Sequence, residues 1–90
     1  MGIALIKIKI MPESPKTDLE LIKDSAYDLI SENDGKNIMF NEEDIAFGLR
    51  AVIASFDLDE SLPLDPIEDS LKEIERVSSV QVIDMRRAFG

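Results

Sequence analysis

The sequence predicts a single α+β domain over residues 1–90, with strands and helices in the order β-α-β-β-α-β. Two patterns carry this prediction. Apolar residues alternate at period two in segments rich in β-branched side chains, and elsewhere they recur every three or four positions behind helix start signals. A chain of 90 residues buries roughly 60–65% of its unfolded surface, enough for one core and not for two.

The first strand is expected at residues 3–10. Its even positions are apolar, and its odd positions include two lysines, so the two faces are Ala4, Ile6, Ile8 and Ile10 against Leu5, Lys7 and Lys9. Segment 11–15 contains two prolines, which break both ladders and helices. The strand is therefore expected to end at residue 10.

The first helix is expected to begin at Thr17, because Thr17 and Glu20 have the spacing of a capping box. Its apolar positions form one core-facing stripe, consisting of Leu19, Ile22, Ala26, Leu29 and Ile30. The segment 33–35 ends the helix, and Gly35 is expected to adopt a positive φ there.

The middle of the chain predicts two strands of different character. Residues 37–41 alternate weakly, which is typical of an edge strand, and the acidic segment 42–44 is expected to be a turn. Residues 49–58 carry apolar side chains at both parities, a pattern that favours a central strand.

The second helix is expected to open with Asp65 as its N-cap and Pro66 in its first turn, with an apolar stripe that reaches Val77. Residues 80–87 predict the last strand. A bulge near Asp84 would exchange the faces of the residues beyond it. Residues 88–90 form a short tail.

This order predicts a ferredoxin-like fold. Two right-handed crossovers place both helices on one face of a four-stranded antiparallel sheet with spatial order 4-1-3-2. The other face is expected to be open and partly apolar, which usually marks a contact surface. Its apolar residues would be Leu5, Ala51, Ile53 and Ile83.

Composition excludes several functions. The net charge of -9 repels nucleic acid and anionic membranes. The absence of cysteine and histidine removes disulfides, thiolate metal sites and the commonest general base, so we expect a cytoplasmic protein with no cofactor or metal. The acidic positions Asp57, Asp59 and Glu60 lack the spacing of a calcium loop and predict a solvated loop.

Two places remain as candidate contact sites. Phe47 precedes Gly48 at a turn, and such an aromatic residue is either part of the core or an interface anchor. Arg86 and Arg87 are the only adjacent basic pair in an acidic chain, either a solvated strand end or a contact with a partner.

Three segments together resemble the archaeal translation elongation factor 1-beta family. They are residues 11–15 with Asp18 and Leu19, residues 45–51 (Ile-Ala-Phe-Gly-Leu-Arg-Ala), and residues 82–87 (Val-Ile-Asp-Met-Arg-Arg). The resemblance implies a ferredoxin-like guanine-nucleotide exchange factor. Such a factor promotes GDP release from elongation factor 1-alpha, which can then rebind GTP. It acts without covalent chemistry, so the resemblance implies that the protein is not an enzyme.

The resemblance also implies a set of partner-binding residues, namely Phe47, Gly48, Arg50, Arg86 and Arg87. In eukaryotic relatives a lysine near the C-terminus approaches the Mg²⁺ site of the GTPase, and Arg87 stands in the corresponding place here as an arginine. We expect a monomer or weak dimer. The alternative hypothesis is a ferredoxin-like module that senses a small molecule or oligomerises through its open sheet face.

Overall fold

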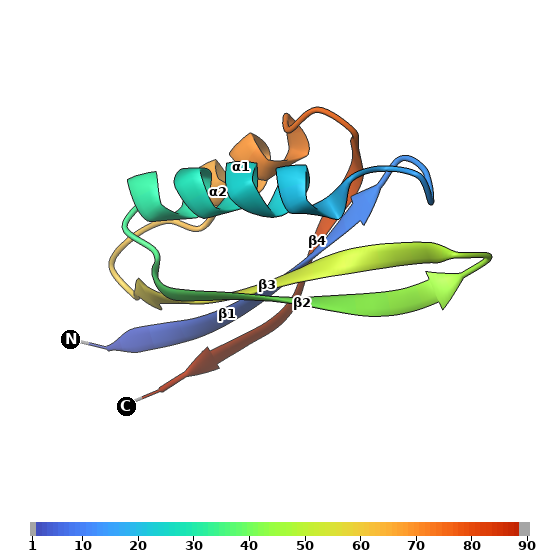
Figure 1. The fold of residues 1–90 in the computed structure, drawn as a ribbon. Coiled ribbons are helices and arrows are strands. Elements are labelled where there is room, and N and C mark those ends of the chain that lie inside the picture. The colour runs from blue at the N-terminus through green and yellow to red at the C-terminus, as the bar shows by residue number, and fades with distance from the viewer. Residues whose placement is uncertain (1, 89–90) are drawn as a thin grey trace.

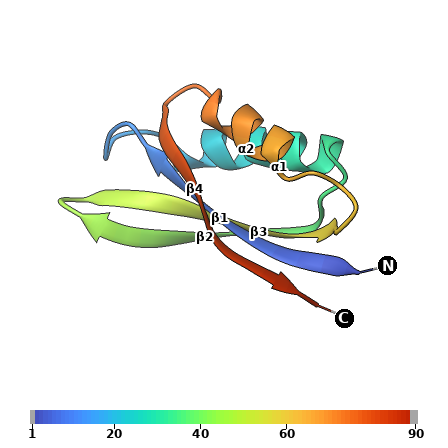
Figure 2. The same ribbon diagram turned by 180° about the vertical axis from the view of Figure 1, so that it is seen from behind.

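Four strands form one antiparallel sheet in the order β2-β3-β1-β4, and both helices cover one face of it in the computed structural model, which describes residues 2–88 (Figure 1). Figure 2 shows the same two layers from behind. The predicted ferredoxin-like topology and strand order are confirmed. The elements are β1 (Ile3–Pro12), α1 (Leu19–Glu32), β2 (Lys36–Ala46), β3 (Leu49–Asp59), α2 (Asp65–Lys72) and β4 (Val77–Arg87).

The core lies between the helices and the sheet. Alternate residues of β1 and β3 meet the apolar stripes of the two helices there, as the periodicity predicted. The fully or almost fully buried residues are Ile6, Ile8, Ile10, Ile22, Ala26, Ile30, Val52, Ala54, Phe56, Leu58, Ile67 and Leu71.

The ends of α1 differ from the prediction. Asp18, not Thr17, is the N-cap, and its Oδ1 accepts a hydrogen bond from the Glu20 amide at 3.0 Å. The positive φ at the C-terminus falls on Asp34, at 70°. Gly35 is instead required for space, because an added Cβ would lie 2.2 Å from Cγ2 of Ile30.

β1 and β4 are both longer than predicted. β1 continues to Pro12, which lies opposite Val77 of β4. A proline is tolerated at this position because the pairing of β1 with β3 has already ended at the row that joins Ile10 and Val52, so Pro12 lies at the end of its strand. The prediction that β1 ends at residue 10 was therefore wrong by two residues.

α2 is shorter than its apolar stripe suggested. It ends at Lys72, and its N-cap is Leu64, which makes no side-chain cap bond, so the prediction of Asp65 as N-cap was wrong. Arg76, with a φ of 75°, turns the chain into β4. Val77 thus belongs to the sheet, where it pairs with β1, and not to the helix.

A bulge interrupts β4 where it was expected. Lys7 pairs with Asp84 and Ile8 with Val82, which leaves Ile83 as the extra residue. Beyond the bulge Met85 lies opposite Ile6, a core residue, so Met85 belongs to the helix-covered side of the sheet. The last residue of the expected tail that the structure describes is Ala88; Phe89 and Gly90 lie outside the described residues.

The open sheet face is less apolar at its surface than predicted. Leu5 and Ile83 are 41% and 43% exposed, but Ala51 and Ile53 are buried, at 0% and 8%. Ile53 is covered because Lys9 and Asn41 flank it in the register, and the stem of a lysine lies readily along an apolar surface.

β2 is the edge strand that its pattern predicted, but the acidic segment 42–44 is part of it and not a turn. The pairing of β2 with β3 continues to Ala46 and Leu49. Residues 42–52 form a hairpin, here called the hairpin arm, which projects beyond the helices at one end of the molecule (Figures 1 and 2). Beyond its first row, where Glu42 lies opposite Val52, the arm is two-stranded.

Candidate partner-binding site

The tip of the hairpin arm is a two-residue turn made by Phe47 and Gly48. Ala46 and Leu49 pair across it, and both turn residues have positive φ, 55° and 80°. Positive φ at both central positions is the signature of a type I′ turn, whose twist matches that of the flanking strands. The phenyl ring is 100% exposed. Phe47 is therefore not a core residue.

Phe47 occupies a backbone conformation that does not suit it. Type I′ turns favour asparagine, aspartate and glycine at this position. For other residue types, the left-handed conformation is about 1–2 kcal/mol higher in free energy than the right-handed one. The exposed ring recovers none of this through burial. A strained residue that does not contribute to the core is a candidate for function.

The turn lies beside the proline-containing loop that follows β1. A Cβ placed on Gly48 would lie 3.9 Å from Cβ of Pro15. Two of the three segments that carry the family resemblance, 11–15 and 45–51, are therefore at the same end of the molecule. Loop 13–18 is closed by its own bonds, including one from the Lys16 amide to Oγ of Ser14 at 3.0 Å.

Arg50 takes part in an ionic network on the helix-covered side of the hairpin arm. Its Nε donates to Oδ1 of Asp44 at 2.7 Å, and its Nη1 donates to Oε1 of Glu42 at 3.1 Å. The other carboxylate oxygen of Glu42 accepts from Nζ of Lys23 in α1 at 2.7 Å. Lys23 is also bonded to Glu20 at 2.9 Å.

Hydrogen bonds in this network widen the pH range over which Glu42, Lys23 and Arg50 are charged, because they shift the pKa of each group. The hydrogen bond from Lys23 lowers the pKa of Glu42 from its ordinary 4.5, and the hydrogen bonds to Glu42 and then Glu20 raise the pKa of Lys23 from 10.5. The hydrogen bond to Asp44 likewise raises the pKa of Arg50. The Lys23–Glu42 attraction is thus fully present between these two ordinary values, and is lost as pH falls through the lowered pKa or rises through the raised one.

Arg86 and Arg87 lie at the other end of the molecule, near the C-terminus of β4 (Figure 1). They face opposite sides of the sheet, because Arg86 is opposite Leu5 and Arg87 is opposite Ala4. The Arg86 guanidinium pairs with Asp84 at 3.0 Å, and the Arg87 guanidinium pairs with Glu60. Both remain largely exposed.

The structure therefore separates the predicted site residues into two groups. Phe47, Gly48 and Arg50 lie on the hairpin arm, whereas the arginine pair lies at the far end of a molecule whose longest dimension is 42 Å. Sequence reasoning missed Lys23 and Glu42, which connect α1 to the arm. The only sequence signal for these two residues was the acidic segment 42–44, and it did not indicate that Lys23, 19 residues away from Glu42, is a partner.

The acidic loop after β3 has a structural role. The Asp59 carboxylate accepts hydrogen bonds from the amide and hydroxyl of Ser61, both at 2.8 Å, and these bonds lower the pKa of Asp59. Within residues 2–88, no group of three or more His, Cys, Asp and Glu side chains could hold a metal ion. No helix in this same range is long and apolar enough to cross a membrane.

Comparison with known proteins agrees with the resemblance seen in the sequence. Proteins named elongation factor 1-beta match over almost their full length: that of Methanosarcina barkeri is 39% identical over 97% of this chain and 99% of its own. Those of Methanocaldococcus jannaschii and Methanococcus maripaludis are each 34% identical, over 98% and 94% of this chain and 100% and 97% of their own.

Among solved structures, the ACT domain from GTP pyrophosphokinase of Chlorobium tepidum superposes with a TM-score of 0.59 at 18% identity, over 88% of this chain and 96% of its own. At that identity the likeness shows the fold alone. The family model of the EF-1 guanine nucleotide exchange domain matches residues 5–88. This range contains both helices and all four strands except the first two residues of β1. The chain belongs to the family of EF-1 guanine nucleotide exchange domains.

Proposed function

We propose that the protein accelerates GDP release from elongation factor 1-alpha by binding this GTPase through the Phe47 tip of the hairpin arm. Nucleotide exchange itself follows from the family to which the chain belongs. The observation that supports the tip as the contact is the fully exposed phenylalanine in a strained turn. Aromatic residues are enriched at protein interfaces and often contribute most of the binding energy.

Exchange requires no covalent chemistry from this protein. A GTPase holds GDP through its phosphate loop and a Mg²⁺ ion, so a partner that displaces these elements weakens nucleotide binding. By linkage, a factor that prefers the empty GTPase lowers nucleotide affinity by the same ratio by which nucleotide lowers the affinity for the factor. Differential binding is therefore sufficient for the activity.

The roles of the other residues follow from their positions. Gly48 supplies the second positive φ of the turn, and Arg50 supports the arm through Asp44 and Glu42. Arg86 and Arg87 provide positive charge for a second contact, at the opposite end of the long axis. We infer a monomer or weak dimer that acts in the cytoplasm, where translation takes place.

The function is tested by measuring the release of fluorescent GDP from the cognate elongation factor 1-alpha. The wild-type protein at stoichiometric concentration is expected to accelerate release about tenfold over the spontaneous rate, because allosteric coupling typically changes affinity about 5–150-fold and such changes appear mainly in the dissociation rate. The matched control is an unrelated GTPase loaded with the same nucleotide, whose release rate should not change. An unchanged rate with the cognate GTPase would refute the proposal.

A second prediction concerns the C-terminal charge. Arg87→Ala is expected to lower stimulated release roughly tenfold, because a hydrogen-bonded charge at an interface contributes about 1.5–3 kcal/mol. Arg87→Lys, which keeps the charge, should retain more activity than Arg87→Ala. The thermal melt should move little in either variant, since the pair with Glu60 is exposed. Full activity of Arg87→Ala would remove Arg87 from the interface.

A further inference from the structure

The hairpin arm begins where the sheet loses its third strand. At the last row that β1 shares with β3, Ile10 lies opposite Val52, and Val52 in turn lies opposite Glu42 of β2. Within the described residues 2–88, residues 43–51 continue only as a pair of strands. Two-stranded ribbons have little stability of their own, and the eight residues 41–48 are all exposed. This row is therefore the place where the arm can bend.

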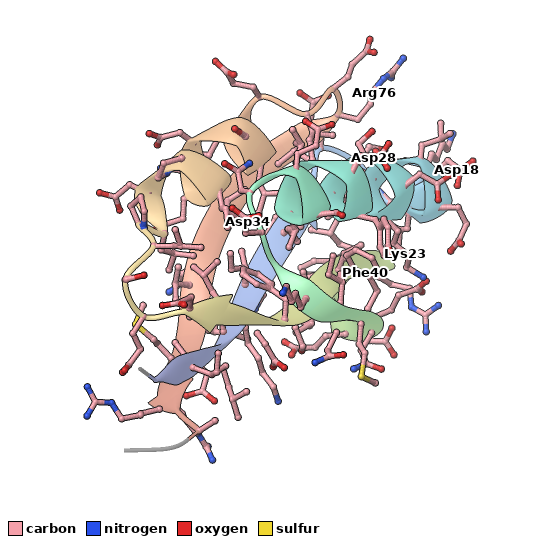
Figure 3. The ribbon with its side chains drawn as sticks, turned by 90° about the vertical axis from the view of Figure 1, so that its left-hand side faces the viewer. Asp18, Lys23, Asp28, Asp34, Phe40 and Arg76 are labelled. Carbon is pink, nitrogen blue, oxygen red and sulfur yellow. The ribbon has the colours of Figure 1, made fainter. Side chains whose placement is uncertain are left out.

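Two lysines form ion pairs with the base of the arm, one on each face of the sheet. Successive residues of a strand point to opposite faces, so Glu42 faces the helices and Glu43 faces the open side. Lys23 reaches from α1 toward the sheet (Figure 3). Its Nζ pairs with Oε2 of Glu42 at 2.7 Å. Lys9 of β1 binds Glu43 on the other face at 3.4 Å. We call these two ion pairs the lysine clamp.

We propose that the lysine clamp holds the hairpin arm in the direction in which the Phe47 tip meets the GTPase, so that Lys23 and Glu42 are positioning residues for nucleotide exchange. This inference rests on the proposed function of Phe47. The stronger half of the clamp is the Lys23–Glu42 pair, whose side chains are only 19% and 26% exposed.

The clamp acts on orientation more than on folding. Ion pairs at a surface contribute little to global stability, and the core does not depend on residues 41–48. A bend at the base of the arm, however, displaces the tip. If the free arm samples many orientations, binding must select one of them, and this loss of conformational entropy weakens the affinity. Preorganisation should therefore appear in the affinity for the partner and not in the thermal melt.

Glu42→Gln tests the clamp, and Glu20→Gln is its matched control because Glu20 also pairs with Lys23 but forms no ion pair with the arm within the described residues. Each variant is measured alone and in the Phe47→Ala background, with GDP release followed as a function of exchange-factor concentration. We expect Glu42→Gln to raise the half-saturating concentration roughly three- to tenfold, with an unchanged maximal rate. It should also speed amide hydrogen exchange in residues 43–50 selectively. Glu20→Gln should change neither.

The Phe47→Ala background separates the possible failures. If the clamp acts by positioning Phe47, Glu42→Gln should have no further effect once Phe47 is removed. An equal effect in both backgrounds would mean that Glu42 contacts the partner directly, and the positioning role would be refuted. A strong loss with Phe47→Ala and none with Glu42→Gln would refute the clamp while leaving the proposed function intact. A normal rate with Phe47→Ala would instead refute the proposed contact itself.

Discussion

Phe47→Ala is expected to weaken the complex with elongation factor 1-alpha by about thirtyfold or more, because truncation of an interface anchor typically costs at least about 2 kcal/mol. The free energy of unfolding should stay within about 0.5 kcal/mol of the wild-type value, since the ring is 100% exposed and alanine retains the positive φ. Stimulated GDP release and chemical denaturation, measured on the same preparation, check the two halves of the prediction.

Phe47→Asn sharpens the prediction because it separates strain from contact. Asparagine tolerates the left-handed conformation, so this variant should be about 1 kcal/mol more stable than wild type, while its exchange activity falls as far as that of Phe47→Ala. Tyr27→Ala is the matched control, since Tyr27 is also an exposed aromatic residue, on α1. A gain of stability without loss of exchange would show that the strain serves no contact with the partner.

The sequence predicted the elements whose signals are local and repeated. Alternation located β1, apolar residues at both parities located β3, and the helical stripes located the core faces of α1 and α2. The strand order followed from two crossovers. The errors lie mainly at element ends. The segment 42–44 looked like a turn because acidic residues are rare in strands, yet Lys9, Lys23 and Arg50 pair with it from three different elements.

The candidate site could likewise be predicted only in part, because its residues are brought together by contacts between different elements. Phe47 and Gly48 attracted attention as neighbours, but their type I′ turn was hidden, since phenylalanine is unusual where positive φ is required. The family resemblance grouped Phe47 with Arg86 and Arg87, whereas the structure places them at opposite ends of the molecule. The distance between residues of different elements depends on strand register and topology, and it cannot be derived from their separation in the sequence.

Ile8→Ala is expected to have the largest effect on stability. Ile8 is 0% exposed in the central strand β1, between Ala54 of β3 and Val82 of β4. Removing a buried isoleucine side chain to Cβ costs about 2–5 kcal/mol, because lost burial and the cavity left behind add together. For a domain of this size about 3 kcal/mol lowers the midpoint of thermal unfolding by roughly 15 °C, which calorimetry would detect.

Ile8→Val, which removes one methylene group, should cost about 1 kcal/mol, and Leu21→Ala should cost little because Leu21 is 65% exposed. At a temperature where Ile8→Ala remains folded, it should still stimulate GDP release normally, since the tip of the hairpin arm lies outside the core. Phe47→Ala and Ile8→Ala thus have opposite expected profiles. If both variants lost exchange and stability in proportion, the arm would be coupled to the core, and exchange could not be assigned to the tip alone.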